Sequence, residues 1–203
     1  MINEPKIVEI KEIIENTPTI KTFIFDWDMD KYGKPNPGEF VMVWNFKNEK
    51  PMSIAQINDN ELAISVKNLG EFTSQLHNLQ VGDQIGIRGS YGNGFDNSLE
   101  GKRVLAIGGG VGMAPIHSIA SDLIKKGNDV DVVSAAQTKD ELLYVDELEG
   151  LGVNVHCCTD DGSFGFKGFA TDCTVGLLED STYDYAFVCG PEIMMKGIFD
   201  ILE

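Results

Sequence analysis

The sequence predicts two domains: an N-terminal antiparallel β-barrel in residues 1–100, followed by an α/β domain with a parallel sheet in residues 101–203. Two observations predict this division. In the first half, short apolar runs alternate with turn residues about every ten positions, which is typical of an antiparallel barrel or sandwich. From Lys102 onward, strand and helix patterns alternate, which is typical of a parallel sheet with crossover helices.

The first half contains six runs that favour strands because they are rich in β-branched and aromatic residues. Clusters of glycine, proline, asparagine and aspartate separate them, the longest at residues 28–38, which we expect to be a turn. The strands are expected at residues 7–14, 20–27, 39–46, 52–57, 62–66 and 84–89, and one short helix at residues 72–78.

The second half is expected to alternate strands at 103–107, 130–135, 153–157 and 185–189 with helices at 114–126, 141–149, 171–178 and 192–202. A long glycine-rich loop should follow the strand at 153–157. We place the boundary between the two domains near Glu100 and Gly101, where the rhythm of the pattern changes.

A glycine-rich turn follows the buried-type strand at 104–107, and an apolar helical pattern follows the turn. Such a turn leaves backbone N–H groups at a helix N-terminus, where the helix dipole favours a phosphate. Gly108 and Gly110 match the start of a dinucleotide fingerprint, but Met113 stands where the last glycine is expected. A glycine turn without a ligand is the alternative, and three consecutive glycines favour nucleotide binding.

The formal net charge is 16 − 32 = −16, and Arg88 and Arg103 are the only arginines. Such a chain repels nucleic acid and anionic lipid, so we expect neither as a partner. No apolar run approaches the roughly 18 residues of a membrane span, and the N-terminus lacks the order of a signal peptide. The sequence therefore predicts a cytoplasmic protein without a membrane segment.

The four cysteines are Cys157, Cys158, Cys173 and Cys189. Their spacing contains no Cys-x-x-Cys pair, so we expect no metal or iron–sulfur ligand set in this chain. Reduced, mostly buried thiols are the default expectation.

Six segments together resemble one family. They are Lys50-Pro51-Met52-Ser53; Gly70-Glu71-Phe72-Thr73; Gly92-Asn93-Gly94-Phe95; Gly108-Gly109-Gly110-Val111-Gly112-Met113-Ala114-Pro115; Asp160-Asp161-Gly162-Ser163-Phe164-Gly165 with Lys167-Gly168; and Cys189-Gly190-Pro191-Glu192 with Met194-Met195. In this order and spacing they resemble the ferredoxin–NADP⁺ reductase superfamily. Within it, the chain is most similar to the FAD- and NAD-binding electron-transfer subunit of NAD-dependent dihydroorotate dehydrogenase, over essentially its whole length.

The resemblance implies that the barrel binds FAD. Lys50 would neutralise a phosphate, although arginine is typical there and lysine cannot form a bidentate fork; the hydroxyl of Ser53 would lie beside the flavin ring. The segment from Gly70 to Thr73, with Lys67 upstream, would receive the FAD diphosphate. An edge strand at Pro51 and ordinary helix capping at Thr73 are the alternatives.

The resemblance also implies that the α/β domain binds NAD(H). The turn at residues 108–115 would hold the pyrophosphate, and residues 160–162 would contact NAD or cover the active site, with a solvated acidic loop as the alternative. Residues 92–95 would contact the flavin or nicotinamide, unless they form a plain hairpin turn. Gln137 stands where NADP-using relatives have an arginine, which favours NAD(H), although Lys139 keeps NADP open.

Cys189 would lie near the nicotinamide C4 and the flavin N5 and would position the reactants without acting as a nucleophile; a packed thiol is the alternative. Gly190 and Pro191, followed by Glu192, would turn the chain there. The implied function is an electron-transfer flavoprotein subunit in pyrimidine biosynthesis. It would pass electrons between NAD(H) and a dihydroorotate dehydrogenase-like partner by hydride transfer to flavin N5.

The family's subunits continue into a cysteine cluster that holds an iron–sulfur centre, whereas this chain ends at Glu203 and offers no such ligands. Either the sequence is shortened before that segment or this member lacks the cluster, and two other functions stay open. One is a stand-alone NAD(P)H:flavin or diaphorase-type reductase, and the other is a non-enzymatic nucleotide-binding module.

Overall fold

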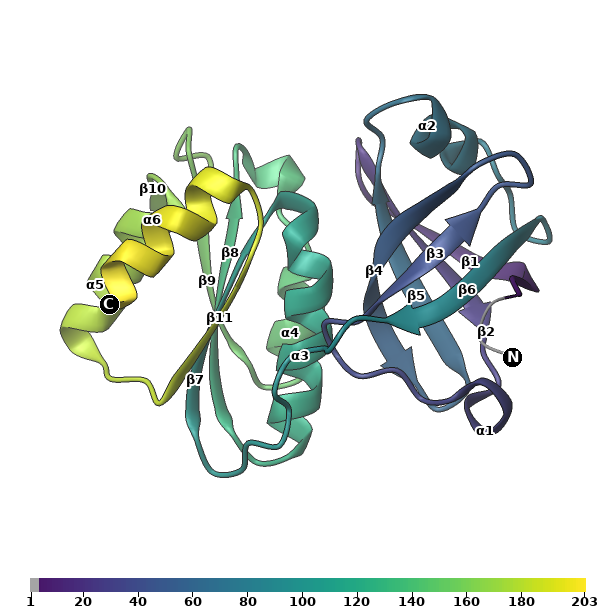
Figure 1. The fold of residues 1–203 in the computed structure, drawn as a ribbon. Helices are drawn as coiled ribbons and strands as arrows, with labels where there is room; N and C mark the ends of the chain where they lie inside the picture. The colour runs from purple at the N-terminus through teal and green to yellow at the C-terminus, as the bar shows by residue number, and fades with distance from the viewer. Residues whose placement is uncertain (1–3) are drawn as a thin grey trace. The chain divides into compact units, whose positions relative to one another are not determined.

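The computed structural model describes residues 4–203. The chain divides into two compact units between Phe95 and Asp96, and each is described by itself (Figure 1). No helix in this described part is both long and apolar enough to cross a membrane.

The first unit is a closed six-stranded antiparallel barrel with the strand order β1-β2-β5-β4-β3-β6, as the sequence predicts. Alternate residues point inward, so Phe23, Phe25, Val41 and Val43 join one fully buried core with Trp27. Pairing of β1 with β6 closes the barrel. The strands are β1 Lys6–Thr17, β2 Ile20–Asp26, β3 Phe40–Trp44, β4 Glu49–Asn58, β5 Glu61–Lys67 and β6 Gln84–Tyr91.

Two helices accompany the barrel, α1 Met29–Tyr32 and α2 Glu71–His77. The sequence predicts only the second, and residues 28–38 are not entirely a turn. Helix α1 forms because Asp28 caps it: its carboxylate accepts the N–H of Lys31 at 2.9 Å. Leu76 of α2 reaches the barrel core.

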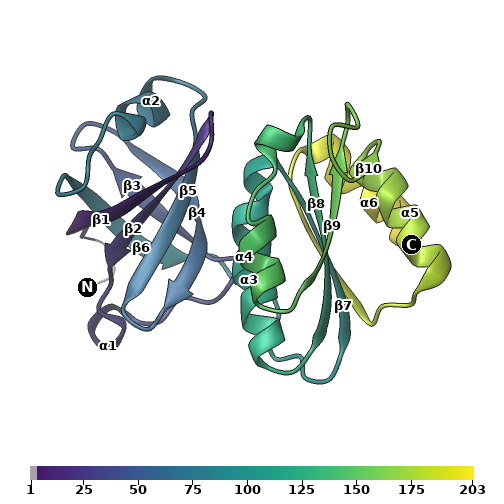
Figure 2. The same cartoon turned by 180° about the vertical axis from the view of Figure 1, so that it is seen from behind.

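The second unit is a five-stranded parallel sheet with the order β10-β9-β8-β7-β11, which confirms the predicted α/β class. Helices α3 and α4 cover one face of the sheet and α5 and α6 the other (Figure 2). The strands are β7 Arg103–Gly109, β8 Asp129–Ala136, β9 Asn154–Thr159, β10 Phe166–Lys167 and β11 Tyr185–Cys189. The helices are α3 Met113–Lys125, α4 Val145–Gly150, α5 Ala170–Asp180 and α6 Glu192–Leu202.

The helix predicted at 141–149 is confirmed only from Val145 onward, and its predicted start is wrong. A 3₁₀ turn, Lys139–Glu141, comes first, and α4 begins only at Val145. Leu143 and Tyr144 are buried between them, and Tyr144 has a left-handed φ of 61°, which interrupts the helix. The loop after β9 also contains the two-residue strand β10, which the sequence pattern does not indicate.

Replacing Gly176 by alanine should stabilise the protein. Gly176 lies inside α5, is exposed, and has nothing within 4 Å of an added Cβ. Alanine lowers the entropy cost of forming a helix, so we expect a gain of about 0.5–1 kcal/mol in urea unfolding. Gly197→Ala in α6 is the control, because its Cβ would lie 2.9 Å from Thr171 Cγ2. Equal effects of the two substitutions would contradict this explanation.

Candidate functional site

The carboxyl end of the parallel sheet brings two of the predicted segments together. Strands β7 and β11 pair in register, so Cys189 lies beside Gly108. The glycine turn, residues 108–112, therefore adjoins residues 189–190. Ligands of open parallel sheets bind at this edge.

Most glycines of the turn are required by the protein's own packing. A Cβ on Gly112 would lie 2.5 Å from the backbone oxygen of Cys189, and one on Gly109 would lie 2.6 Å from Met194 Sδ. A Cβ on Gly108 would collide with the side chain of Met113. Gly110 differs, because nothing lies within 4 Å of its added Cβ and its φ is +55°. The backbone of the turn is thus open at Gly110.

The start of α3 suits an anion. A 3₁₀ turn, Gly110–Gly112, runs directly into this helix of 13 residues, and Gly112 at the N-cap provides no side chain to cap it. The first-turn N–H groups and the helix dipole therefore favour negative charge. Met113, Ala114 and Pro115 are buried, and Val111 is half-buried, so these residues shape the turn from beneath.

Cys189 is half-buried, and burial raises the pKa of its thiol. The thiol is therefore protonated at neutral pH, which argues against a nucleophilic role. Gly190 is packed against Met194, whose Cε would lie 2.6 Å from an added Cβ. Pro191 and Glu192 are exposed where α6 begins.

The loops that follow β8 and β9 lie side by side at the same edge. The N–H of Asp160 donates to Ala136 O at 3.1 Å, and that of Asp161 donates to Gln137 O at 3.2 Å. Gln137 is thus adjacent to the exposed residues 160–162. Hydrogen bonds from Ser163 hold the pKa of Asp161 below its usual value, so this loop carries negative charge.

In the barrel unit, the four residues from Lys50 to Ser53 all lie on β4 but do not share one face. Lys50 is opposite Val43 and Met52 is opposite Val41, on the inner side. Pro51 and Ser53 therefore point to the outer side. The segment cannot present all four side chains to one ligand from a single face of the strand.

The hydroxyl of Thr73 is used by its own helix. It accepts the N–H groups of Leu69 at 2.9 Å and Gly70 at 3.0 Å, and it donates to Gly70 O at 3.0 Å. Ordinary capping thus accounts for this hydroxyl, while Glu71 is exposed and Phe72 half-buried. Neither Lys50 nor Lys67 forms an ion pair within residues 4–203, so both ammonium groups are available to a phosphate.

Residues 92–95 pack onto the loop before β3. Phe95 donates its N–H to Pro37 O at 2.7 Å, and a Cβ on Gly94 would lie 2.9 Å from the same oxygen. Gly92 and Asn93 are exposed. The segment is therefore a tightly held connection after β6, and no strand follows it within the barrel to make a hairpin.

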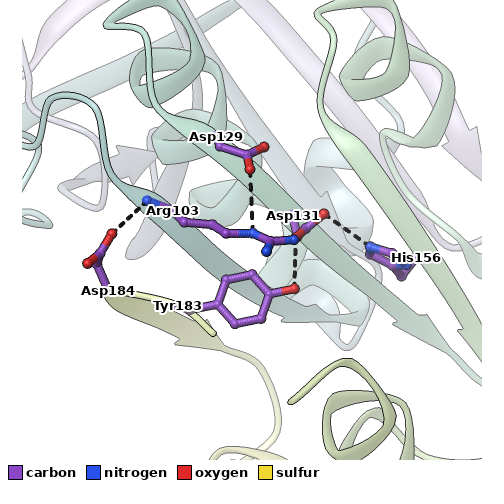
Figure 3. A network of polar contacts seen from close by, with 6 residues as sticks. All are labelled: Arg103, Asp129, Asp131, His156, Tyr183 and Asp184. Atoms are coloured by element: carbon purple, nitrogen blue, oxygen red, sulfur yellow. Dashed lines mark hydrogen bonds and ion pairs between the residues drawn. The ribbon is translucent and has the colours of Figure 1, made fainter. Parts of the chain in front are cut away.

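Sequence reasoning missed a polar network at the amino end of the parallel sheet (Figure 3). The carboxylate of Asp131, whose side chain is 4% exposed, is its centre. It accepts the hydroxyl of Tyr183 at 2.7 Å, and it lies 3.2 Å from His156 Nε2 and 3.4 Å from an Nη of Arg103. The network borders a cavity of about 590 Å³. These residues come from separate strands and loops, and no local pattern signals their meeting.

Within residues 4–203, no group of three or more His, Cys, Asp or Glu side chains is placed to hold a metal ion. The four cysteines are free thiols.

A six-stranded antiparallel barrel joined to a parallel α/β unit with a glycine turn at its carboxyl edge defines the ferredoxin reductase-like oxidoreductases. Residues 106–200 match the oxidoreductase NAD-binding domain. The solved structure of an NADH-dependent reduced ferredoxin–NADP oxidoreductase has a TM-score of 0.83 and 30% identity, over 96% of this chain and 71% of that chain. A ferredoxin–NADP⁺ reductase from Neisseria gonorrhoeae shares the fold, with a TM-score of 0.82 and 19% identity, over 98% of this chain and 90% of that one.

Relatives define the family more narrowly. The chain is 48% identical to a probable electron transfer subunit of dihydroorotate dehydrogenase B (NAD⁺) from Methanothermobacter thermautotrophicus, over 100% of this chain and 74% of the relative. The corresponding protein of Methanocaldococcus jannaschii is 43% identical over 98% of this chain and 74% of its own length. The chain belongs to this family of electron transfer subunits.

Proposed function

We propose that this protein passes electrons between NAD(H) and a dihydroorotate dehydrogenase-like partner subunit, with FAD bound by the barrel unit. The observation that carries the proposal is the open backbone at Gly110, at the uncapped start of α3, in the glycine turn whose Gly108 pairs with Cys189. The 48% identity to an electron transfer subunit supports the partner.

The α/β unit has the features that a dinucleotide requires. The N–H groups around Gly110 would take the pyrophosphate, because no side chain blocks them and the dipole of α3 attracts the charge. The adjacent loops with Gln137 and residues 160–162 would take the adenosine end. Cys189, as a protonated thiol, would position the nicotinamide without attacking it.

In the barrel unit, Lys50 and Lys67 would neutralise the FAD phosphates, and backbone groups from Gly70 onward would supplement them. Hydride transfer between nicotinamide and flavin N5 is the chemistry that the two cofactors supply when bound. The protein's part is to bind and orient them and to exclude water. We also propose a cytoplasmic location, which the four free thiols support.

An absorption spectrum of the natively isolated protein, with and without NADH under anaerobic conditions, tests this function. We expect a flavin spectrum that NADH bleaches by reducing the flavin, and that the oxidised partner subunit restores by accepting the electrons. The same spectrum would also reveal the iron–sulfur centre that the family resemblance implies. A preparation that takes up no FAD would contradict the proposal. Fast turnover with small acceptors, not increased by the partner, would favour a stand-alone reductase.

Replacing Lys50 by glutamate should weaken FAD binding. The change reverses one charge next to the expected phosphate, so we expect the Kd for FAD to rise about tenfold, or about 1.4 kcal/mol. Quenching of flavin fluorescence measures the Kd. Lys47→Glu is the matched control, because Lys47 is also exposed and lies three residues before Lys50, in the connection between β3 and β4. An equal rise of the Kd for FAD in both variants would show that net charge alone causes the effect, and would contradict a specific role of Lys50.

A further inference from the structure

The loops after β8 and β9 are hydrogen-bonded to each other at the carboxyl edge of the sheet. We call residues 137–141 and 160–165 the paired loops. Three backbone N–H groups hold them together: that of Asp160 donates to Ala136 O at the end of β8, that of Asp161 donates to Gln137 O in the first loop, and that of Lys139 donates to Ser163 Oγ at 2.8 Å. The first loop follows β8, which is next to the strand β7 that carries the glycine turn, and the second loop follows β9, which is next to β8.

The backbone of Phe164 is hydrogen-bonded through both its N–H and its carbonyl group. Its N–H donates to Thr159 Oγ1 at 3.1 Å, and its carbonyl accepts the hydroxyl of the same threonine at 2.7 Å. Thr159 is fully buried. The backbone of Phe164 is thus hydrogen-bonded to a buried residue, while Phe164 as a whole is 42% exposed.

The side chain of Lys139 lies on the ring of Phe164, with Nζ 5.2 Å from the ring centroid. Lys139 is therefore held twice, by its backbone N–H and by a cation–π contact. The other lysine nearby is also engaged: the stem of Lys167 lies against Gly162, and its charge acts on Asp161.

The charges of the paired loops are unbalanced. Four carboxylates stand in these loops, and Lys139 is the only cation within them; the carboxylates are Asp140, Glu141, Asp160 and Asp161. An additional phosphate would meet this negative charge with no free cation to receive it. A neutral hydroxyl would meet no such penalty, and the amide of Gln137 could hydrogen-bond it.

We propose that Phe164 sets the preference for a dinucleotide with a free adenosine 2′-hydroxyl, because it holds Lys139 away from a 2′-phosphate. The inference rests on the proposed NAD(H) site and names the specificity of that site. Phe164 acts through Lys139 and is a positioning residue, and the carboxylates of the paired loops reinforce the same preference.

Calorimetric titration with ADP-ribose and with its 2′-phosphorylated form tests the proposal without requiring turnover. In Phe164→Ala, the affinity for the phosphorylated form relative to ADP-ribose should rise about two- to fivefold, which corresponds to about 0.5–1 kcal/mol. Adding Lys139→Ala to this variant should return the ratio to the wild-type value. Phe169→Ala is the matched control, because Phe169 is 65% exposed and lies outside the paired loops, and it should leave the ratio unchanged.

An unchanged ratio in Phe164→Ala, or a gain that persists without Lys139, would overturn the inference while leaving the proposed nucleotide site intact. Failure of the wild-type protein to bind ADP-ribose at all would overturn that site and the inference with it. Because Phe164 is exposed, its replacement by alanine should cost little stability. Circular dichroism verifies that each variant is folded.

Discussion

Replacing Gly112 by alanine should destabilise the α/β unit by about 3 kcal/mol. The φ of Gly112 is −62°, which alanine adopts without strain, so the cost is purely steric. The new Cβ would lie 2.5 Å from the oxygen and 2.7 Å from the carbonyl carbon of Cys189. Both neighbours are backbone atoms at the end of a strand, so they cannot move aside as a flexible side chain would. Urea unfolding followed by circular dichroism measures the loss.

The same substitution should weaken ADP-ribose binding more than tenfold, because it pushes Cys189 away from the glycine turn. Gly110→Ala is the control that separates binding from stability. No atom lies within 4 Å of its Cβ, and only its φ of +55° opposes alanine, at a cost of about 1 kcal/mol. Its methyl group would nevertheless stand where the phosphate approaches. Equal stabilities of the two variants would contradict the steric argument for Gly112.

The strand, glycine turn and helix at residues 103–125 could be predicted because each is signalled locally. A β-type apolar run, a set of glycines and a 3.6-residue period follow one another there. The contact between Gly112 and Cys189 could not be derived in this way. It depends on the parallel register of β7 and β11, whose residues are about eighty positions apart in the chain.

Where the sequence-based predictions were wrong, tertiary packing determined the structure instead of the local pattern. The charged segment at 141–149 has a helical composition, but burial of Leu143 and Tyr144 delays the helix to Val145. The sequence allowed the hydroxyl of Thr73 either to bind a phosphate or to cap its own helix, and in the structure it caps the helix. Strand alternation likewise divides the segment from Lys50 to Ser53 between two faces, which a linear motif does not reveal.

The polar network around Asp131 could not be predicted from the sequence either, because tertiary packing brings its residues together. Its loss should have a second large effect on stability. Asp131→Asn should destabilise the protein by about 2–3 kcal/mol at pH 7. The amide keeps the shape of the carboxylate but removes the charge that faces Arg103 and the acceptor strength that serves Tyr183 and His156. Asp129→Asn is the matched control: Asp129 pairs with the same arginine at 3.4 Å but is 61% exposed. Its loss should stay below about 0.5 kcal/mol.

The effect of Asp131 should depend on pH in a definite direction. Burial raises the pKa of its carboxyl, but hydrogen bonds from Tyr183, His156 and Asn154 outweigh burial and hold the pKa below the ordinary value of 3.8. A depressed pKa means that the carboxylate stabilises the fold above that value and loses this contribution as pH falls through the folded-state pKa. The stability difference between wild type and Asp131→Asn should therefore be full at pH 7 and shrink toward pH 3. A difference that stays constant over this range would show that shape, and not the ionised carboxylate, is what the network requires.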